Sequence, residues 1–172
     1  LGDVAHQGIA ARVGEFSYAD APTLLKVDGP SVILVLDEVQ DPHNLGAVIR
    51  SAAAFGVQGI VIPRHRSAAV TPTVRKVAVG AERRVPIAQV VNCTRFIEDA
   101  KAAGFWVYGA VVDAPTPLWS TDFSEKSVLV VGSEGRGVRP SVAAACDMTV
   151  GIPMVAAESL NVSVAAGVLL YE

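Results

Sequence analysis

The stretch "SVILVLDEVQDPHNLGAVIRSAAAFGVQGIVIP", residues 31–63, decides the fold. Its first six residues, 31–36, form a continuous aliphatic and β-branched run, which is typical of a strand buried on both faces. After Asn44 the apolar residues follow helical spacing and form one stripe, made of Leu45, Val48, Ile49, Ala52 and Phe55. A second apolar run at 59–63 completes a strand, helix, strand order, which predicts an α/β protein with a parallel sheet.

The helix predicted over 44–55 carries one basic residue, Arg50, opposite its apolar stripe. The other residues on that side are small enough for another backbone to come close, namely Gly46, Ala47, Ser51, Ala53 and Ala54. We therefore expect both faces of this helix to be packed, with Asn44 as its N-cap. A guanidinium keeps its charge and is costly to bury alone, so Arg50 needs an anionic or polar partner.

The same alternation continues to the end of the chain. Further strands are predicted over 85–91, 105–112, 127–132 and 148–153, and further helices over 71–79, 94–103, 140–146 and 158–172. Residues 1–30 show no sustained period and contain at most one short strand, so they are interpreted as a lead-in segment. The last helix has no charge before Glu172, which predicts burial on all sides, in part against a second subunit.

Composition restricts the class of protein. A chain of 172 residues that is 51% hydrophobic fits one domain with a real core. The longest apolar stretch, 162–171, is about half of the ~20 residues that a membrane-spanning helix requires, and no secretory leader is recognised, so a cytoplasmic protein is expected. Cys93 and Cys146 are far apart in the sequence and form no C-x-x-C, so the sequence predicts reduced thiols and no metal site.

Basic residues are concentrated in one part of the chain, although the net charge is −3. Between positions 64 and 84 the only acid is Glu82, and the basic residues are Arg64, Arg66, Arg75, Lys76, Arg83 and Arg84. This basic segment is a candidate phosphate-binding stripe. An ordinary solvated surface explains the same residues equally well.

Three polar loops follow buried strands, at 37–44, 132–137 and 152–161. In open parallel sheets ligands bind at the carboxyl ends of the strands, so these loops are expected to form one site. Their candidate residues are Asn44, Glu134, Ser159 and Asn161, together with Arg50 of the helix that follows the first loop. A nicotinamide-dependent enzyme is disfavoured, because "DPHNLGA" at 41–47 stands where the G-x-G-x-x-G fingerprint belongs.

The same loops carry a family resemblance. "DPHNLGAVIRSAAAFG" at 41–56, "VVGSEGRGV" at 130–138 and "IPMVAAESLNVSVAAGVLLYE" at 152–172 resemble the three ordered motifs of the SpoU, or TrmH-like, RNA ribose 2'-O-methyltransferases of the SPOUT superfamily. "HQGIAARV" at 6–13 resembles the join between the RNA-binding and catalytic domains of bacterial enzymes that methylate a guanosine of large-subunit ribosomal RNA. The resemblance implies a lead-in or linker at 1–29, following an N-terminal RNA-binding domain, and a catalytic domain at 30–172.

What the resemblance implies for the fold and the donor site is specific. It implies a parallel-sheet α/β knot with a C-terminal trefoil knot, a homodimer, and S-adenosylmethionine bound in the knot as methyl donor. Carried over position by position, the expected donor-binding residues are Gly132, Gly135, Ile152, Pro153, Met154 and Leu160. Ala156 departs from the glycine common in the family, which would strain the backbone if the position required a positive φ.

For catalysis the resemblance points to Arg50. A guanidinium that keeps its proton is a poor general base, so Arg50 is expected to stabilise the attacking ribose oxygen or to anchor the adjacent phosphate. Asn44, Glu134, Ser159 and Asn161 would orient Arg50, the ribose and the donor, and His43 ranks below Arg50.

Two alternatives to ribosomal RNA methylation stay open at this point. Transfer RNA is an alternative substrate, because the three motifs do not distinguish the two RNAs. A non-catalytic RNA-binding module for ribosome assembly would keep the fold without turnover, and the joint presence of Arg50, Glu134 and Asn161 argues against it.

Overall fold

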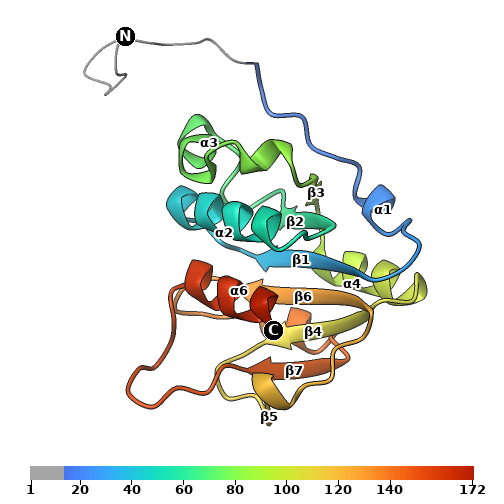
Figure 1. The fold of residues 1–172 in the computed structure, drawn as a ribbon, viewed down its shortest axis with the longest axis vertical. Helices are drawn as coiled ribbons and strands as arrows, with labels where there is room; N and C mark the ends of the chain where they lie inside the picture. Colours follow the sequence, from blue (N-terminus) through green and yellow to red (C-terminus); the bar gives the residue numbers. More distant parts are fainter. Residues whose placement is uncertain (1–13) are drawn as a thin grey trace.

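In the computed structural model, which describes residues 14–172, seven parallel strands form one sheet in the order β3-β2-β1-β6-β4-β7-β5 (Figure 1). The strands are β1 (Ser31–Asp37), β2 (Gly59–Pro63), β3 (Ile87–Val90), β4 (Trp106–Ala110), β5 (Thr116–Pro117), β6 (Lys126–Gly132) and β7 (Met148–Gly151). Every neighbouring pair is parallel, which confirms the predicted parallel-sheet α/β fold.

Helices cover both faces of this sheet (Figure 1). One face carries α2 (Pro42–Ala54), α3 (Pro72–Ala78) and α6 (Val162–Tyr171), and the other carries α1 (Ala21–Leu24), α4 (Cys93–Ala102) and α5 (Pro140–Ala143). Alternate residues of β1 serve the two layers, with Leu34 and Leu36 facing the first group and Ile33 and Val35 the second. Two short 3₁₀ turns, η1 (Ala81–Arg83) and η2 (Leu118–Ser120), complete the elements.

The centre of the sheet is the pair β1 and β6, which stay in register from Ser31 beside Lys126 to Asp37 beside Gly132. Ile33, Leu34, Val35 and Leu36 have no exposed surface, as expected for a strand covered on both faces. Both strands end at the same edge of the sheet. The loops that follow them therefore start side by side.

Most predicted elements are present, with ends that differ by a few residues. The start of α2 is a correction, because Asp41 rather than Asn44 is the N-cap and accepts a hydrogen bond from the His43 backbone N–H at 2.9 Å. Asp41 precedes Pro42, and proline fits the first helical turn without losing a backbone donor. The helix predicted to end at Cys146 already ends at Ala143. The short elements α1, β5 and η2 are absent from the sequence prediction.

The two charge-poor helices, α2 and α6, are less enclosed within one chain than predicted. Gly46 packs closely on α3, since a Cβ there would lie 2.6 Å from the Cβ of Val77. Arg50 and Ala54, however, are exposed, and Phe55 of the predicted apolar stripe has 47% of its surface exposed to solvent.

On α6 the side chains of Val164, Val168 and Tyr171 are exposed, so the helix is not buried on all sides within this chain. The rings of Phe55 and Tyr171 meet edge to face at 6.2 Å and join the exposed surfaces of the two helices. Both helices therefore present apolar surface that a single chain leaves uncovered.

The described part of the lead-in lies against the domain. Ala19 bridges Ala88 of β3, and the Tyr18 hydroxyl accepts a hydrogen bond from the Val70 backbone N–H at 2.9 Å. The stretch "HQGIAARV" at 6–13 lies outside the described residues. Between residues 14 and 172, no helix has the length and apolar character needed to cross a membrane.

Candidate active site

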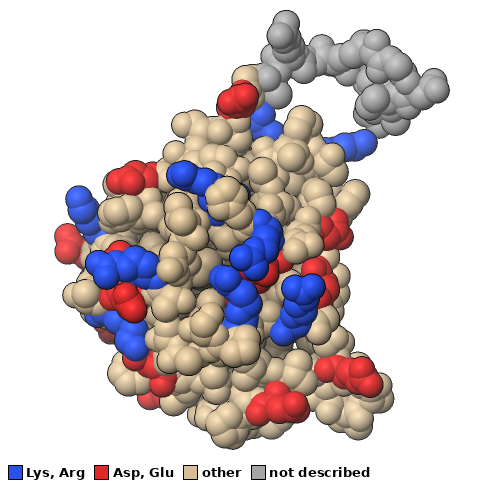
Figure 2. All heavy atoms as spheres, turned by 180° about the vertical axis from the view of Figure 1, so that it is seen from behind, with Lys and Arg blue, Asp and Glu red and all other residues tan. Residues whose placement is uncertain are grey.

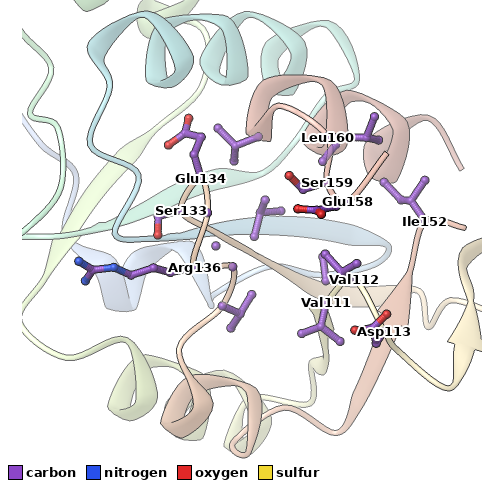
Figure 3. A pocket seen from close by; sticks show the side chains of 18 of the residues that line it. Val111, Val112, Asp113, Ser133, Glu134, Arg136, Ile152, Glu158, Ser159 and Leu160 are labelled. Atoms are coloured by element: carbon purple, nitrogen blue, oxygen red, sulfur yellow. The ribbon is translucent and has the colours of Figure 1, made fainter. Parts of the chain in front are cut away.

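A pocket of about 580 Å³ opens at the carboxyl ends of β4, β6 and β7 (Figure 3). Its walls come from three chain segments, residues 110–113, 131–138 and 150–165. In Figure 3 the loop that carries Ser133, Glu134 and Arg136 stands on one side of the cavity, and Glu158, Ser159 and Leu160 stand on the other. Two of the three predicted loops, 132–137 and 152–161, therefore line one pocket. The loop at 37–44 does not line it, and residues 110–113 after β4 form the third wall.

The pocket collects most of the residues predicted to bind the methyl donor. Gly132, Gly135, Ile152, Met154 and Leu160 line it, together with Glu134 and Ser159 of the predicted catalytic group. Pro153 is exposed and lies beside the lining residues without belonging to them.

Residues 132–138, here called the glycine loop, fold back tightly on the end of β6. A Cβ at Gly132 would lie 1.8 Å from the carbonyl carbon of Gly137, so only glycine fits there. Ser133 and Gly137 exchange two backbone hydrogen bonds, of 3.2 and 2.9 Å, across the loop. Gly135 and Gly137 have φ values of 78° and 65°, which residues with a side chain rarely adopt. The loop thus presents backbone to the cavity at close range.

A chain of hydrogen bonds joins the three predicted loops. The Asn44 side-chain amide donates to the carboxylate of Glu134. The Asn161 amide donates to Oδ1 of Asn44 at 3.0 Å, and Oδ1 of Asn161 caps α6 by accepting from the Ser163 backbone N–H at 2.9 Å. Asn161 is thus the N-cap of α6 as well as a partner of Asn44. These contacts fix the Glu134 carboxylate at the rim of the pocket.

Arg50 is not part of this series of hydrogen bonds. It lies six residues after Asn44 on α2, about 9 Å along the helix axis and ~120° around it. Its side chain is exposed and takes no part in the hydrogen bonds and ion pairs found among residues 14–172. The structure therefore leaves Arg50 facing solvent, where a ligand or another chain could reach it.

The basic segment is divided among several elements. Arg64 and Arg66 follow β2 at the carboxyl edge of the sheet, Arg75 and Lys76 lie in α3, and Arg83 and Arg84 lie in and after η1. Figure 2 shows Lys and Arg side chains interspersed with Asp and Glu, rather than one continuous band, on the face seen from behind.

Arg75 has partners within the chain. Its Nε lies 3.7 Å from the Glu82 carboxylate, its Nη1 donates to the Gly14 carbonyl at 3.3 Å, and only 22% of its side chain is exposed. Arg66, by contrast, keeps 73% of its side chain exposed while lying 3.5 Å from Glu38. The exposed members of the segment, rather than Arg75, are the ones available to an external phosphate.

Several polar residues of the site are not among those predicted from the sequence. Asp113, Arg136 and Glu158 line the pocket. Asp113 follows β4, which ends at the same edge as β6, so the strand-end rule could have found it. Asp37 is fully buried and bonded to Arg139, and nothing in the local sequence indicates that pairing.

The structure also bears on Ala156 and on the Cys93 thiol. The non-glycine residues with positive φ between 14 and 172 are Glu38, Arg66 and Val79, so Ala156 adopts ordinary backbone and is not strained. Burial, followed by the negative charge of Asp37, raises the pKa of the Cys93 thiol to about 11. That thiol is therefore protonated at neutral pH and does not act as a nucleophile.

The site suits a nucleoside-type methyl donor. Its volume is within the range of pockets for ligands of that size, and its walls combine apolar side chains with a few polar ones. Val131, Ile152 and Leu160 can contact an aromatic base, Glu134 and Ser159 can hold polar groups, and the backbone of the glycine loop is open to close approach. This is the architecture of an α/β enzyme domain that binds its ligand at the strand ends.

The chain belongs to the family described as the SpoU rRNA Methylase family, whose profile matches residues 31–171. An uncharacterized tRNA/rRNA methyltransferase of Synechocystis sp. is 46% identical over 172 residues, covering 97% of this chain and 45% of that protein. The 23S rRNA (guanosine-2'-O-)-methyltransferase RlmB of Coxiella burnetii is 44% identical over 177 residues, covering 100% of this chain and 71% of that protein.

Among solved structures, the SpoU methyltransferase AviRb of Streptomyces viridochromogenes in complex with the cofactor AdoMet superposes with a TM-score of 0.80 at 28% identity, over 89% of this chain and 60% of that chain. The predicted family is thereby confirmed, and with it the class of S-adenosylmethionine-dependent RNA methyltransferase domains. The chain spans less than half of the Synechocystis relative and about 60% of AviRb.

Proposed function

We propose that the protein transfers the methyl group of S-adenosylmethionine to a ribose 2'-hydroxyl of RNA, at a guanosine of 23S ribosomal RNA. The pocket formed by the glycine loop and residues 152–160 is the observation that carries this proposal. Family membership supports the chemistry, and the named activity of the Coxiella relative supports the choice of RNA. An enzyme with this substrate is expected to work in the cytoplasm, where ribosomes are assembled.

The donor-binding group is proposed to be Gly132, Gly135, Ile152, Pro153, Met154 and Leu160. When bound, the donor supplies an electrophilic methyl group on a positively charged sulfur. Gly132 and Gly135 allow the loop backbone to approach the donor, and Ile152 and Leu160 exclude water from it. Glu134, held by the Asn44 amide, offers a fixed negative charge near the cationic ligand.

For the acceptor, Arg50 is the proposed catalytic residue. The ribose oxygen bonds to the methyl carbon as the sulfur–methyl bond breaks, S-adenosylhomocysteine leaves and the hydroxyl proton passes to solvent. As that proton leaves, the oxygen gains negative charge, and a guanidinium can stabilise that charge or hold the neighbouring phosphate. Its exposed position on α2 favours the phosphate role in a single chain. Asn44, Ser159 and Asn161 would orient the ribose and the donor, since Asn44 and Asn161 are already fixed by hydrogen bonds.

We also propose a C-terminal trefoil knot for this chain. After β7 the segment 152–161 sweeps outward, and α6 returns to pack against α2 and beside β6 (Figure 1). The same segment faces the glycine loop across the pocket. A crossing of these two segments would bring the donor-binding residues together, as the sequence resemblance implies.

A homodimer is proposed through α2 and α6. Phe55, Val164, Val168 and Tyr171 expose apolar surface on these adjacent helices, and large exposed apolar surface marks an association site. The small residues on the Arg50 side of α2, other than Gly46, which packs on α3, would then pack against the second subunit. Arg50 would lie at the edge of that interface.

RNA is proposed to bind along the basic segment, through Arg64, Arg66, Lys76, Arg83 and Arg84, with Arg75 contributing less because it is engaged within the chain. Arg64 and Arg66 follow β2 at the edge of the sheet where the pocket opens. A backbone phosphate bound there could lead the ribose toward the pocket.

The test combines donor binding with methyl transfer. Calorimetric titration with S-adenosylmethionine and its demethylated product should give saturable binding, and labelled methyl should pass to 23S rRNA transcripts. Arg50→Lys should keep donor affinity and lose most transfer, whereas Arg95→Lys, at an exposed surface ion pair on α4, should keep both. Preferred methylation of transfer RNA would overturn the choice of substrate. Absence of donor binding would favour the non-catalytic module, and near-normal turnover by Arg50→Lys would remove that residue from the mechanism.

A further inference from the structure

Arg139, the residue that directly follows the glycine loop, is bound to one buried carboxylate. Its Nε and Nη2 donate to Oδ1 of Asp37 at 2.9 and 2.6 Å, and its backbone N–H donates to Oδ2 at 2.9 Å. Asp37 has no exposed surface, whereas 35% of the Arg139 side chain is exposed. Three short donor contacts therefore converge on one carboxylate beneath the loop.

Asp37 holds both ends of the glycine loop. Through its backbone it pairs with Gly132, the first residue of the loop, in the β1–β6 register. Through its side chain it binds Arg139, the residue after the last one of the loop. The loop therefore leaves and returns to the sheet at a single residue of β1.

The contact is strong and sensitive to geometry. A guanidinium fork matched to a carboxylate adds orientation as well as attraction, and a buried charge left without its partner is costly. Hydrogen bonding to Asp37 raises the pKa of Arg139, so this guanidinium keeps its charge. Glu38, also buried and held at a φ of 62°, adds a second carboxylate 3.2 Å from Nη1 of Arg139.

Few other contacts fix the loop relative to the sheet. Within the described residues, its internal backbone hydrogen bonds join Ser133 only to Gly137, and its outward side-chain hydrogen bond is Glu134 with Asn44. Its last residue, Val138, next to Arg139, is buried in the core. Gly135 and Gly137 have no side chains to pack. Because the loop backbone lines the donor pocket, a small change at its anchored end would move the surface that the donor contacts.

The geometry points to Asp37 and Arg139 as positioning residues that hold the glycine loop in its donor-binding conformation. This inference rests on the proposed role of that loop in binding the methyl donor. Neither side chain is among the residues that line the pocket, so both act through the loop.

The test compares Arg139→Met with Lys101→Met. Lys101 makes a comparable ion pair on another part of the domain, with its Nζ 2.7 Å from Asp147, whose side chain accepts a hydrogen bond from the Val107 backbone N–H. The affinity for S-adenosylhomocysteine is measured by calorimetry well below the unfolding temperature, beside the unfolding temperature itself. Arg139→Met should weaken binding at least tenfold, Arg139→Lys should give an intermediate loss, and Lys101→Met should stay within twofold of the parent protein.

Hydrogen exchange of the Gly137 amide, which donates to the Ser133 carbonyl, provides a readout that needs no ligand. Protection should fall in Arg139→Met and Arg139→Lys, while the amides of β1 and β2 keep theirs. Equal donor affinity in Arg139→Met and the parent, or equal losses in Arg139→Met and Lys101→Met, would overturn the inference. If the parent protein itself binds no donor, the proposed function fails. Unchanged protection of the Gly137 amide from hydrogen exchange in Arg139→Lys would separately refute the positioning role.

Discussion

Two regions of the molecule differ in how far apart in the sequence their contacting residues lie. One is the unit formed by β1, α2 and β2, and the other is the pocket built around the glycine loop. In the first, neighbouring elements pack through a helical stripe and two short apolar strands within residues 31–63. In the second, Asn44 meets Glu134 from 90 positions away, and Asp37 meets Arg139 from 102. The first unit follows local periodicity, whereas the site exists only when the whole sheet has formed.

This difference predicts how each region responds to one added methyl group. The largest effect is expected for Gly132→Ala, because the new Cβ would lie 1.8 Å from backbone of Gly137, which cannot rotate away. The loop would have to separate from the end of β6. We expect a loss of about 3 kcal/mol of folding free energy and a roughly 100-fold weaker affinity for S-adenosylhomocysteine. Denaturant unfolding and calorimetry measure the two quantities.

Gly135→Ala is the matched control within the same loop. A Cβ at Gly135 meets nothing within 4 Å, but its φ of 78° disfavours a side chain. The expected cost is therefore only about 1 kcal/mol. Equal losses in the two variants would show that loop conformation, and not the close approach at Gly132, limits the site.

The same contrast explains which features the sequence could predict. The continuous apolar run at 31–36 indicates a buried strand, and the helical spacing of the stripe on α2 indicates a helix. Both elements were therefore predictable, with small errors at their ends. Asn44 and Glu134 could be placed at one sheet edge because parallel strands share an edge. Their direct bond, and that of Asp37 with Arg139, depends on strand order, which no local pattern contains.

A medium effect is expected inside the first unit, at Gly46. A Cβ there would lie 2.6 Å from the Cβ of Val77 and 2.9 Å from the Val74 carbonyl, so α2 and α3 would have to move apart. Overpacking costs about 1–3 kcal/mol and the gain in helix propensity returns roughly 0.5–1 kcal/mol, so Gly46→Ala should destabilise by about 1–2 kcal/mol. Donor affinity should stay near that of the parent protein, because the change lies outside the pocket.

Gly167→Ala on α6 is the counterpart with room for a methyl group, since its closest neighbour is the Ser51 hydroxyl at 4.0 Å. Here only the higher helix propensity of alanine should matter, and it should raise the free energy of unfolding by about 0.5–1 kcal/mol. Chemical unfolding of both variants gives the comparison. If Gly46→Ala stabilised to the same extent, the close packing of α2 on α3 would be wrong.

The smallest effect concerns the two thiols, Cys93 and Cys146, which both belong to the core layer on the α4 and α5 side of the sheet. Burial raises the pKa of Cys93, beneath β1, to about 11, and also that of Cys146, after α5, to about 11. The unfolded thiols lose their protons near pH 9, whereas the folded ones keep theirs, so stability is complete below pH 9 and falls as the pH rises toward 11. Between pH 8 and 9.5 the expected loss is about 0.8 kcal/mol for each thiol. The free energy of unfolding is measured against pH for Cys93→Ala, Cys146→Ala and the double variant. The slope of its fall between pH 8 and 9.5 should be halved in each single variant and absent in the double one. A slope that persisted in the double variant would assign the alkaline loss to other groups. A slope removed by Cys93→Ala alone would show that Cys146 is open to solvent and that burial raises the pKa of Cys93 only.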